Sequence, residues 1–362
     1  MADLSVSPPA ALARLSIPVQ WVLLAALSGI VLLPLELLHL PAALLLGPMV
    51  AGIVFGVGEA RIKMPAPAFT LAQVVIGCLM AKSLPGSVFG ELVTKWPIYV
   101  IGIGSVIAVA AGLGILLTRL KVLPGTTAIW GSAPGASTAM IVMADAFGAD
   151  ARLVAFMLYL RVVMVALAAA VISRLFVSGT AVAAATPWFP PVAALPFAET
   201  LGLIAGSIVI TRLFRIPAGA ILLPMFGGLL LQDLFGMQIE LPPALLAVAY
   251  VAVGWTIGLR FTRDILMHAA RALPAVIGSL LALLLACGLF AVLLVMFAGV
   301  DPLTAYLATS PGGADSVAII AASSKVDVPF VMAMQAGRFI VVLLTGPALA
   351  RFIATRSWMP KG

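Results

Sequence analysis

The amino-acid sequence predicts an all-α polytopic membrane protein made of two inverted-topology repeats. Each repeat has about five transmembrane helices and one segment that a Pro-Gly pair breaks or turns back. Three observations support this class: an apolar composition, apolar runs of spanning length, and motifs that recur in the same order in both halves. The residues are 63% hydrophobic and 9% charged, whereas soluble domains have about 25% charged residues. A soluble globular protein is therefore excluded.

The apolar runs define the elements in order, since a membrane-spanning helix needs roughly 20 residues. In the first half they cover 17–38, 42–58, 66–82, 96–119, a broken segment at 125–147, and 152–176. In the second half they cover 197–213, 218–235, 243–260, 273–298, a broken segment at 303–324, and 328–353. The predicted organisation is a first membrane repeat at 1–176, an uncharged linker at 177–196, and a second membrane repeat at 197–362.

The two halves share motifs at matching positions. Residues 128–165 align with residues 305–342 without a gap, which pairs Pro134 with Pro311, Gly135 with Gly312, and Arg161 with Arg338. Upstream, PAALLLGPMVAG at 41–52 matches PAGAILLPMFGG at 217–228. Matched motifs in matched order indicate an internal repeat.

The charges of the connecting segments predict the orientation of the repeats, because basic residues collect in cytoplasmic loops. The linker has no Lys or Arg and is expected outside, whereas Lys82, Lys95 and Arg174 fit this assignment less well. The basic loops of both halves lie on the cytoplasmic side only when each half crosses the membrane an odd number of times. This predicts about ten membrane crossings, opposite orientation of the halves, and both termini in the cytoplasm. The basic loop residues are Arg61, Lys63, Arg119, Lys121, Arg212, Arg215, Arg260, Arg263 and Arg271.

Both broken segments are candidate parts of a binding site. Proline removes a backbone donor and glycine frees the backbone, so each Pro-Gly pair should end one short helix and start another. A half-helix N-terminus carries about +0.5 charge, and inverted repeats bring two such ends together. The alternative is a pair of kinks that serve packing alone. The candidate residues are Ser132, Pro134, Gly135, Ser137, Thr138, Thr309, Ser310, Pro311, Gly312, Gly313 and Ser316.

Arg161 and Arg338 are the most informative single residues. Each lies roughly 14 Å into its helix at 1.5 Å per residue, near the middle of a ~30 Å hydrocarbon core. An arginine there costs at least about 2.5 kcal/mol unless it is paired or solvated. Two interpretations stay open: the guanidinium groups bind an anionic substrate, with Gln335 on the Arg338 face, or each caps the carbonyls of its broken helix.

Asp315 distinguishes the second half, since Thr138 occupies the equivalent position in the first. An acid beside a break in a membrane helix is a candidate for H⁺ or Na⁺ coupling. The alternatives are a helix N-cap and a fixed partner of Arg338. Asp150 and Asp327 are expected at the membrane surface, as helix caps or gate contacts.

The sequence argues against an enzyme and predicts no metal or other cofactor. Its two histidines, His39 and His268, are too isolated for a metal cluster, and no nucleophile or nucleotide-binding motif occurs in a suitable context. Cys78 and Cys287 lie inside apolar runs and are expected to pack as reduced thiols. No basic segment suited to nucleic acid is present.

The paired segments GSAPGA and TSPGGA, each followed by a helix containing LRVV or GRFI, resemble the AbrB-type bacterial membrane proteins, an internally duplicated family. The resemblance covers essentially the whole chain. It implies an inner-membrane transporter with an effect on gene expression. Members of the family are often labelled as an ammonia monooxygenase or as a transcriptional regulator. Two distant histidines do not supply a copper site, however, and the chain has no soluble basic module.

Together these features predict a secondary transporter of a small anionic solute that works by alternating access, with H⁺ or Na⁺ coupling. The alternative is a membrane-embedded sensor that binds a ligand without net transport. The expected partners are the lipid bilayer and the anionic solute, not nucleic acid, and a homodimer is left open.

Overall fold

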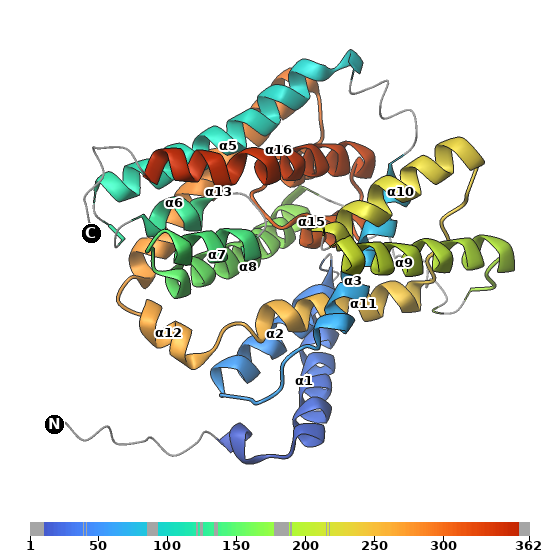
Figure 1. The fold of residues 1–362 in the computed structure, drawn as a ribbon, viewed down its shortest axis with the longest axis horizontal. Helices are drawn as coiled ribbons and strands as arrows, with labels where there is room; N and C mark the ends of the chain where they lie inside the picture. Colours follow the sequence, from blue (N-terminus) through green and yellow to red (C-terminus); the bar gives the residue numbers. More distant parts are fainter. Residues whose placement is uncertain are drawn as a thin grey trace.

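The computed structural model describes residues 11–38, 40, 42–84, 93–120, 122–123, 126–133, 137–176, 188, 190–214, 216 and 218–354. These residues form helices and their connections, with no strand among them (Figure 1). The predicted linker lies outside the described residues through 187 and again at 189.

Helices of the first half match the predicted spans closely. They are the 3₁₀ helix η1 (Ala11–Arg14), α1 (Ile17–Leu37), α2 (Ala43–Val57), α3 (Ala66–Ser83), α5 (Trp96–Arg119), α6 (Thr127–Ser132), α7 (Ser137–Ala146) and α8 (Ala151–Phe176). The predicted broken segment at 125–147 is the pair α6 and α7. Prolines stand at the first turns of α1, α3 and α5, where a missing N–H has no cost.

The described helices of the second half follow the same order as those of the first. The elements are α9 (Ala194–Phe214), α10 (Gly219–Phe235), α11 (Pro243–Gly258), α12 (Arg263–Ala269), α13 (Leu273–Ala298), α14 (Pro302–Thr309), α15 (Ala314–Ala322) and α16 (Val328–Ala354). The broken segment predicted at 303–324 is the pair α14 and α15. The short helix α12 was not predicted; it begins where the Thr262 hydroxyl accepts a hydrogen bond from the Ile265 N–H.

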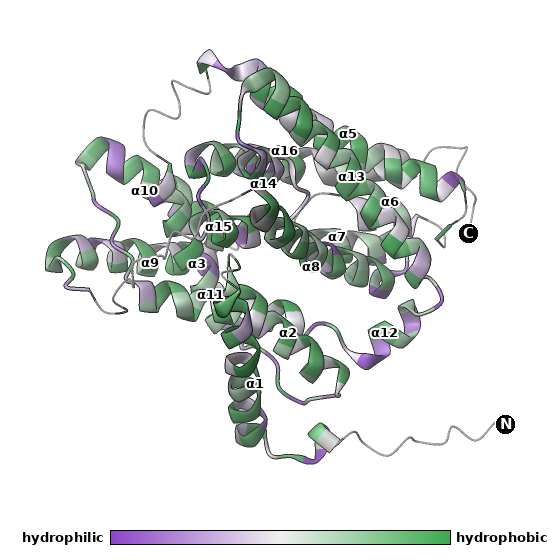
Figure 2. Cartoon of the chain, turned by 180° about the vertical axis from the view of Figure 1, so that it is seen from behind, coloured by the Kyte–Doolittle hydropathy of each residue, from purple (hydrophilic) through white to green (hydrophobic). Residues whose placement is uncertain are grey.

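The helices have the length and composition of membrane spans. Six stretches in the described chain qualify: α1, α3, α5, residues 151–172 of α8, α9 and α13. The pair α11 and α12, bent by 51°, is a seventh, while α2 and α10 are shorter apolar helices. Hydrophobic residues run along the helices, and hydrophilic ones gather mainly at ends and connections (Figure 2). The chain is thus an all-helical, multi-pass membrane protein.

Close helix pairs join the two halves. α2 packs on α11, and α10, the counterpart of α2, packs on α3. Glycines permit this approach: a methyl group at Gly254 would lie 2.6 Å from the Leu45 carbonyl oxygen, and one at Gly77 would lie 2.6 Å from that of Ile221. Small residues at such interfaces are the usual means by which membrane helices pack tightly.

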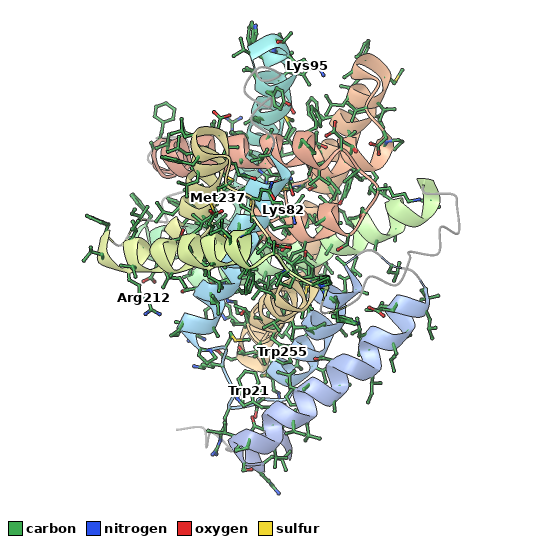
Figure 3. All side chains as sticks on the ribbon, turned by 90° about the vertical axis from the view of Figure 1, so that its right-hand side faces the viewer. Trp21, Lys82, Lys95, Arg212, Met237 and Trp255 are labelled. Atoms are coloured by element: carbon green, nitrogen blue, oxygen red, sulfur yellow. The ribbon has the colours of Figure 1, made fainter. Side chains whose placement is uncertain are left out.

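The remaining helices surround the breaks. α5 packs on α13, and each of them also covers the first broken helix of its own half, α6 or α14. α8 and α16 pack against both parts of their own broken pair. α1 is attached at the margin, where Trp21 and Trp255 lie 5.6 Å apart by ring centroids and Trp255 Nε1 donates to Ser28 Oγ (Figure 3).

Candidate functional site

The second break is described in full and confirms the predicted interruption. The helix α14 ends at Thr309 and α15 begins at Ala314. Between them, Ser310 and Gly313 have extended backbone. In the first break, α6 ends at Ser132 and α7 begins at Ser137. Pro134 and Gly135 lie outside the described residues, as do the side chains of Ser137 and Thr138. The side chains of Ser132, Thr309, Ser310 and Ser316 are buried.

Hydroxyl groups at the second break bond to the backbone of their own helix. Thr309 Oγ1 donates to the Ala305 carbonyl at 2.9 Å, and Ser310 Oγ donates to the Leu307 carbonyl at 3.1 Å. Ser310 N donates to the Tyr306 carbonyl at 2.7 Å, which closes the last turn of α14. These contacts define where the helix stops. They occupy the Thr309 and Ser310 hydroxyl hydrogens in this conformation.

Arg338 binds the carbonyl end of α14. It donates to the carbonyls of Ser310 and, at 2.7 Å, Gly312, and to Gln335 Oε1 at 2.5 Å. Gln335 Nε2 in turn donates to the Leu307 carbonyl at 2.6 Å. Proline and an extended backbone leave these carbonyls without helical donors, so the guanidinium and the amide replace them.

Arg161 has the equivalent role in the first half. Its Nη1 donates to the Ala133 carbonyl at 2.9 Å, directly after α6. Ala133 is the counterpart of Ser310 in the gapless alignment of the two halves. In this conformation both arginines therefore cap the carbonyls of their own broken helices, which is one of the two interpretations that the sequence left open.

Both guanidinium groups are buried close together. Arg161 is 2% exposed and Arg338 is 4% exposed, and their charges repel each other. The first half also contacts the second break, because the Tyr306 hydroxyl donates to the Val165 carbonyl and Gly312 faces the Val165 side chain. Val165 lies one turn beyond Arg161 on α8. The structure therefore brings the two arginines from separate halves toward one place.

The positive charge at this place is poorly balanced by the protein. Nε of each arginine is buried and has no hydrogen-bond partner. In the part of the chain that the structure describes, the ion pairs join other side chains, at the surface. A buried cation without a counter-ion is costly. This arrangement favours an anion in the same place.

Asp315 lies on the first turn of α15 and is partly buried. Its Oδ1 accepts hydrogen bonds from Ser316 N at 2.8 Å and from Ser316 Oγ at 3.3 Å. Gly313 is the N-cap residue of α15, and no described hydrogen bond joins Asp315 to Arg338. Asp315 is therefore neither the N-cap nor the bonded partner of Arg338 in this conformation.

Arg260, which the sequence suggested as a cytoplasmic loop residue, interacts electrostatically with Asp315. Its guanidinium carbon lies 4.9 Å from the ring centre of Tyr159 on α8 and 5.8 Å from that of Phe69 on α3. α15 packs against both of these helices. Cation–π contacts thus hold Arg260 against the elements that flank Asp315.

Asp150 and Asp327 cap equivalent helices, as expected. Their Oδ1 atoms accept hydrogen bonds from Leu153 N and Phe330 N, each at 3.0 Å. Burial favours a higher pKa for Asp150, but the hydrogen bonds from His268 and the backbone outweigh it, so the pKa lies below its ordinary value. Sequence reasoning missed His268, since nothing near it in sequence marks Asp150 as its partner.

The described residues contain no group of three or more His, Cys, Asp or Glu that could hold a metal ion. Cys78 and Cys287 are buried free thiols, as predicted.

Comparison with known proteins identifies relatives along nearly the whole chain. A family model described as "Transition state regulatory protein AbrB" matches residues 44–354. The "Putative regulator AbrB" of Escherichia coli (strain K12) is 46% identical over 339 residues, which cover 93% of this chain and 97% of the relative. The "Uncharacterized protein YhjN" of Bacillus subtilis (strain 168) is 24% identical over 303 residues, 78% of each chain. Because the family model matches most of the chain and the E. coli relative is 46% identical, the chain belongs to the AbrB family.

Proposed function

We propose that the protein is a secondary transporter of a small anionic solute. The observation that carries this proposal is the pair Arg161 and Arg338, two buried guanidinium groups from separate halves, each with an unpartnered Nε–H. An anion between them would accept those hydrogens and remove the repulsion between the two charges. When no anion is bound, the carbonyls of the broken helices solvate the same groups. The two interpretations of the arginines then describe two stages of one cycle.

The contacts between the halves support alternating access by two inverted repeats, at 1–176 and 197–362 with a linker at 177–196. α2 meets α11 while its counterpart α10 meets α3, as a two-fold axis between the halves would require. The loop charges favour an axis in the membrane plane, with about ten crossings and both termini in the cytoplasm. Rocking of one repeat against the other would expose the arginines to each side in turn.

The two helices that follow the breaks add to the positive field at the arginines. α7 and α15 each start beside a break, and the N-terminal end of a helix carries about half a positive charge. Broken helices that point such ends at an anionic group are a recurring device in transporters. A bound carboxylate or other oxyanion is therefore the expected substrate chemistry.

Flux into liposomes tests the proposal. The purified protein is reconstituted, and uptake of radiolabelled acetate, lactate, succinate, phosphate and sulfate is measured under an imposed H⁺ or Na⁺ gradient. We expect uptake of at least one anion above that of protein-free liposomes. Saturable binding of an anion with no flux under either gradient would instead support the sensor. The name of the E. coli relative, a regulator, favours that second candidate.

Asp315 is the proposed coupling residue, with Arg260 as its counter-ion. Burial penalises the charged carboxylate of Asp315, and the nearby Arg260 offsets part of that penalty, so binding of H⁺ or Na⁺ would accompany a change in the contact between Arg260 and Asp315. Asp315→Asn removes the charge and should reduce gradient-driven accumulation at least about tenfold, which corresponds to about 1.4 kcal/mol. Exchange of labelled for unlabelled anion across the same liposomes should persist, because exchange needs no net ion movement.

Asp233→Asn is the matched control, since Asp233 is an exposed acid near the end of α10. It should leave accumulation and exchange unchanged. Accumulation by Asp315→Asn equal to that of the parent would remove Asp315 from the coupling step.

A further inference from the structure

The arginines beside the two helix breaks form a pair of buried positive charges that the protein does not balance. Among the residues that the structure describes, Arg161 and Arg338 are the only fully buried charged side chains. The described aspartates and glutamates are exposed or only partly buried. Asp315, on the first turn of α15, interacts electrostatically with Arg260. The described chain thus places two positive charges at this site and no buried carboxylate.

A third side chain shows that the two charges share one place. The thiol of Cys287, on α13, interacts electrostatically with both guanidinium groups, and these groups repel each other. Cys287 is fully buried, and Thr309 Oγ1 lies 3.3 Å from its carbonyl oxygen beside the second break. In its neutral form the thiol balances neither charge. A ligand at this place would therefore meet both arginines.

The hydrogen-bond donors left for a ligand belong mainly to the arginines. The hydroxyl groups of Tyr306, Thr309 and Ser310 donate to backbone carbonyls. The Nε–H groups of Arg161 and Arg338 are buried and have no partner. A ligand that satisfies both must present an acceptor to each guanidinium. Hydrogen bonds between a guanidinium and an anionic oxygen are about twice as strong as those between neutral groups.

The surroundings of the second break are apolar and closely packed. A methyl carbon at Gly312 would lie 2.9 Å from Val165 Cγ1 and 3.0 Å from Val317 Cγ2. Charges interact more strongly in such surroundings than in water, because the effective dielectric constant is lower. The match between the charge of the ligand and the charge of the site should therefore dominate the affinity, and the packing favours a small ligand.

We propose that the site between Arg161 and Arg338 selects a small anion with two negative charges, as in a tetrahedral oxyanion or a short dicarboxylate. A monovalent anion would leave one buried charge unbalanced, and an unbalanced buried charge is costly. This inference rests on the proposed function, because it specifies the substrate of the same site.

Paired anions of similar shape and different charge test the preference in the parent protein. Succinamate is succinate with one carboxylate replaced by a neutral amide, and methanesulfonate is sulfate with one oxygen replaced by a methyl group. Equilibrium dialysis of the full chain in detergent measures binding of the four radiolabelled anions near pH 7 at constant ionic strength. We expect sulfate or succinate to bind at least about tenfold more tightly than its monovalent counterpart. The pair that shows this difference tells a tetrahedral oxyanion from a dicarboxylate.

Substitutions at Cys287 change the charge of the site and keep both arginines. Cys287→Asp adds a carboxylate near the two guanidinium groups. Because one positive charge is then balanced by the protein, the preference should move to the monovalent member of the pair. Cys287→Asn is the matched control, since it has nearly the same shape as the aspartate variant without its charge. It should keep the preference for the divalent anion.

Arg161→Gln removes one charge by a second route and should weaken divalent binding at least about tenfold. Arg161 is chosen because Arg338 binds two carbonyls and the Gln335 amide oxygen, so its loss disturbs the break more. Arg212→Gln, at an exposed position of α9, is the control for binding to surface charge and should leave all affinities unchanged.

Equal or weaker binding of the divalent member in both pairs would overturn the proposal. This comparison needs no variant, so it stands if a substitution prevents folding. A divalent preference that persists in both Cys287→Asp and Arg161→Gln would also overturn it. Divalent binding without flux in liposomes would refute the transporter and leave the charge preference intact. Flux of a monovalent anion with no divalent preference would refute this inference alone.

Discussion

Replacing Arg338 by alanine is expected to lower the free energy of unfolding by about 2–4 kcal/mol and to abolish anion flux. The carbonyls of Ser310 and Gly312 and the amide oxygen of Gln335 would lose their donor inside the protein. Each buried acceptor left unsatisfied costs about 1–3 kcal/mol, and relief of the repulsion from Arg161 offsets part of this cost. The measurement is thermal unfolding of the purified protein in detergent, beside flux in liposomes.

Arg338→Lys separates the two roles of the side chain. An ammonium keeps the charge but lacks the planar fork that reaches both carbonyls. If Arg338→Lys is less stable but still binds the anion, the charge of the side chain serves substrate binding and the planar guanidinium fork serves the helix break. Arg212→Ala, at an exposed position near the end of α9 (Figure 3), is the control and should change neither property. Parental stability in Arg338→Ala would mean that the carbonyls find other donors.

Gly258→Ala is expected to destabilise the protein by about 3 kcal/mol or more, because it forces α11 away from α2. The added methyl carbon would overlap the Met49 carbonyl oxygen and would lie 2.7 Å from Gly52 Cα. Both are backbone atoms, so no side-chain rotation can relieve the contact. Thermal unfolding and the yield of folded protein after membrane extraction measure the effect.

Gly278→Ala is the matched control for this substitution. Gly278 lies in α13, and no neighbouring atom lies within 4 Å of the place that an alanine methyl carbon would take. Alanine there should therefore be neutral or stabilise the protein by up to about 1 kcal/mol. Gly254→Ala and Gly77→Ala, with equivalent contacts in the two halves, should have costs similar to that of Gly258→Ala. Normal stability in Gly258→Ala would contradict the close packing of α2 on α11.

Local features of the sequence were sufficient for most of the fold. Apolar runs of spanning length and the prolines near their starts placed each long helix to within a few residues. The Pro-Gly pairs predicted the positions of both breaks, because proline and glycine change the conformation of the backbone at their own positions. The helix α12 was missed, since its seven residues include Arg263, Asp264 and His268 and have no apolar periodicity. Its cap at Thr262 and its contacts with α8 stabilise it.

The site could be predicted in part. The alignment of the halves identified Arg161 and Arg338 as an equivalent pair beside the breaks, which needs sequence alone. It could not decide what the guanidinium groups contact, because the acceptors at Ala133 and Ser310 lie 28 residues away in the chain. The contacts of Arg260 and His268 could not be predicted for a related reason: their partners, Tyr159 and Asp150, belong to the other half of the chain.

By itself the sequence determined the membrane class, the order of the helices, the internal repeat and the positions of the two breaks. These properties depend on hydrophobicity, chain length and backbone chemistry, which act within a few residues. Tertiary structure decided that both arginines cap broken helices, that Arg260 lies on aromatic rings near Asp315, and that α12 is tied to α8. Such contacts depend on which helix faces pack together. Hydrogen bonds and ion pairs act over a few ångströms between residues that are distant in the chain, so only the packed structure defines them.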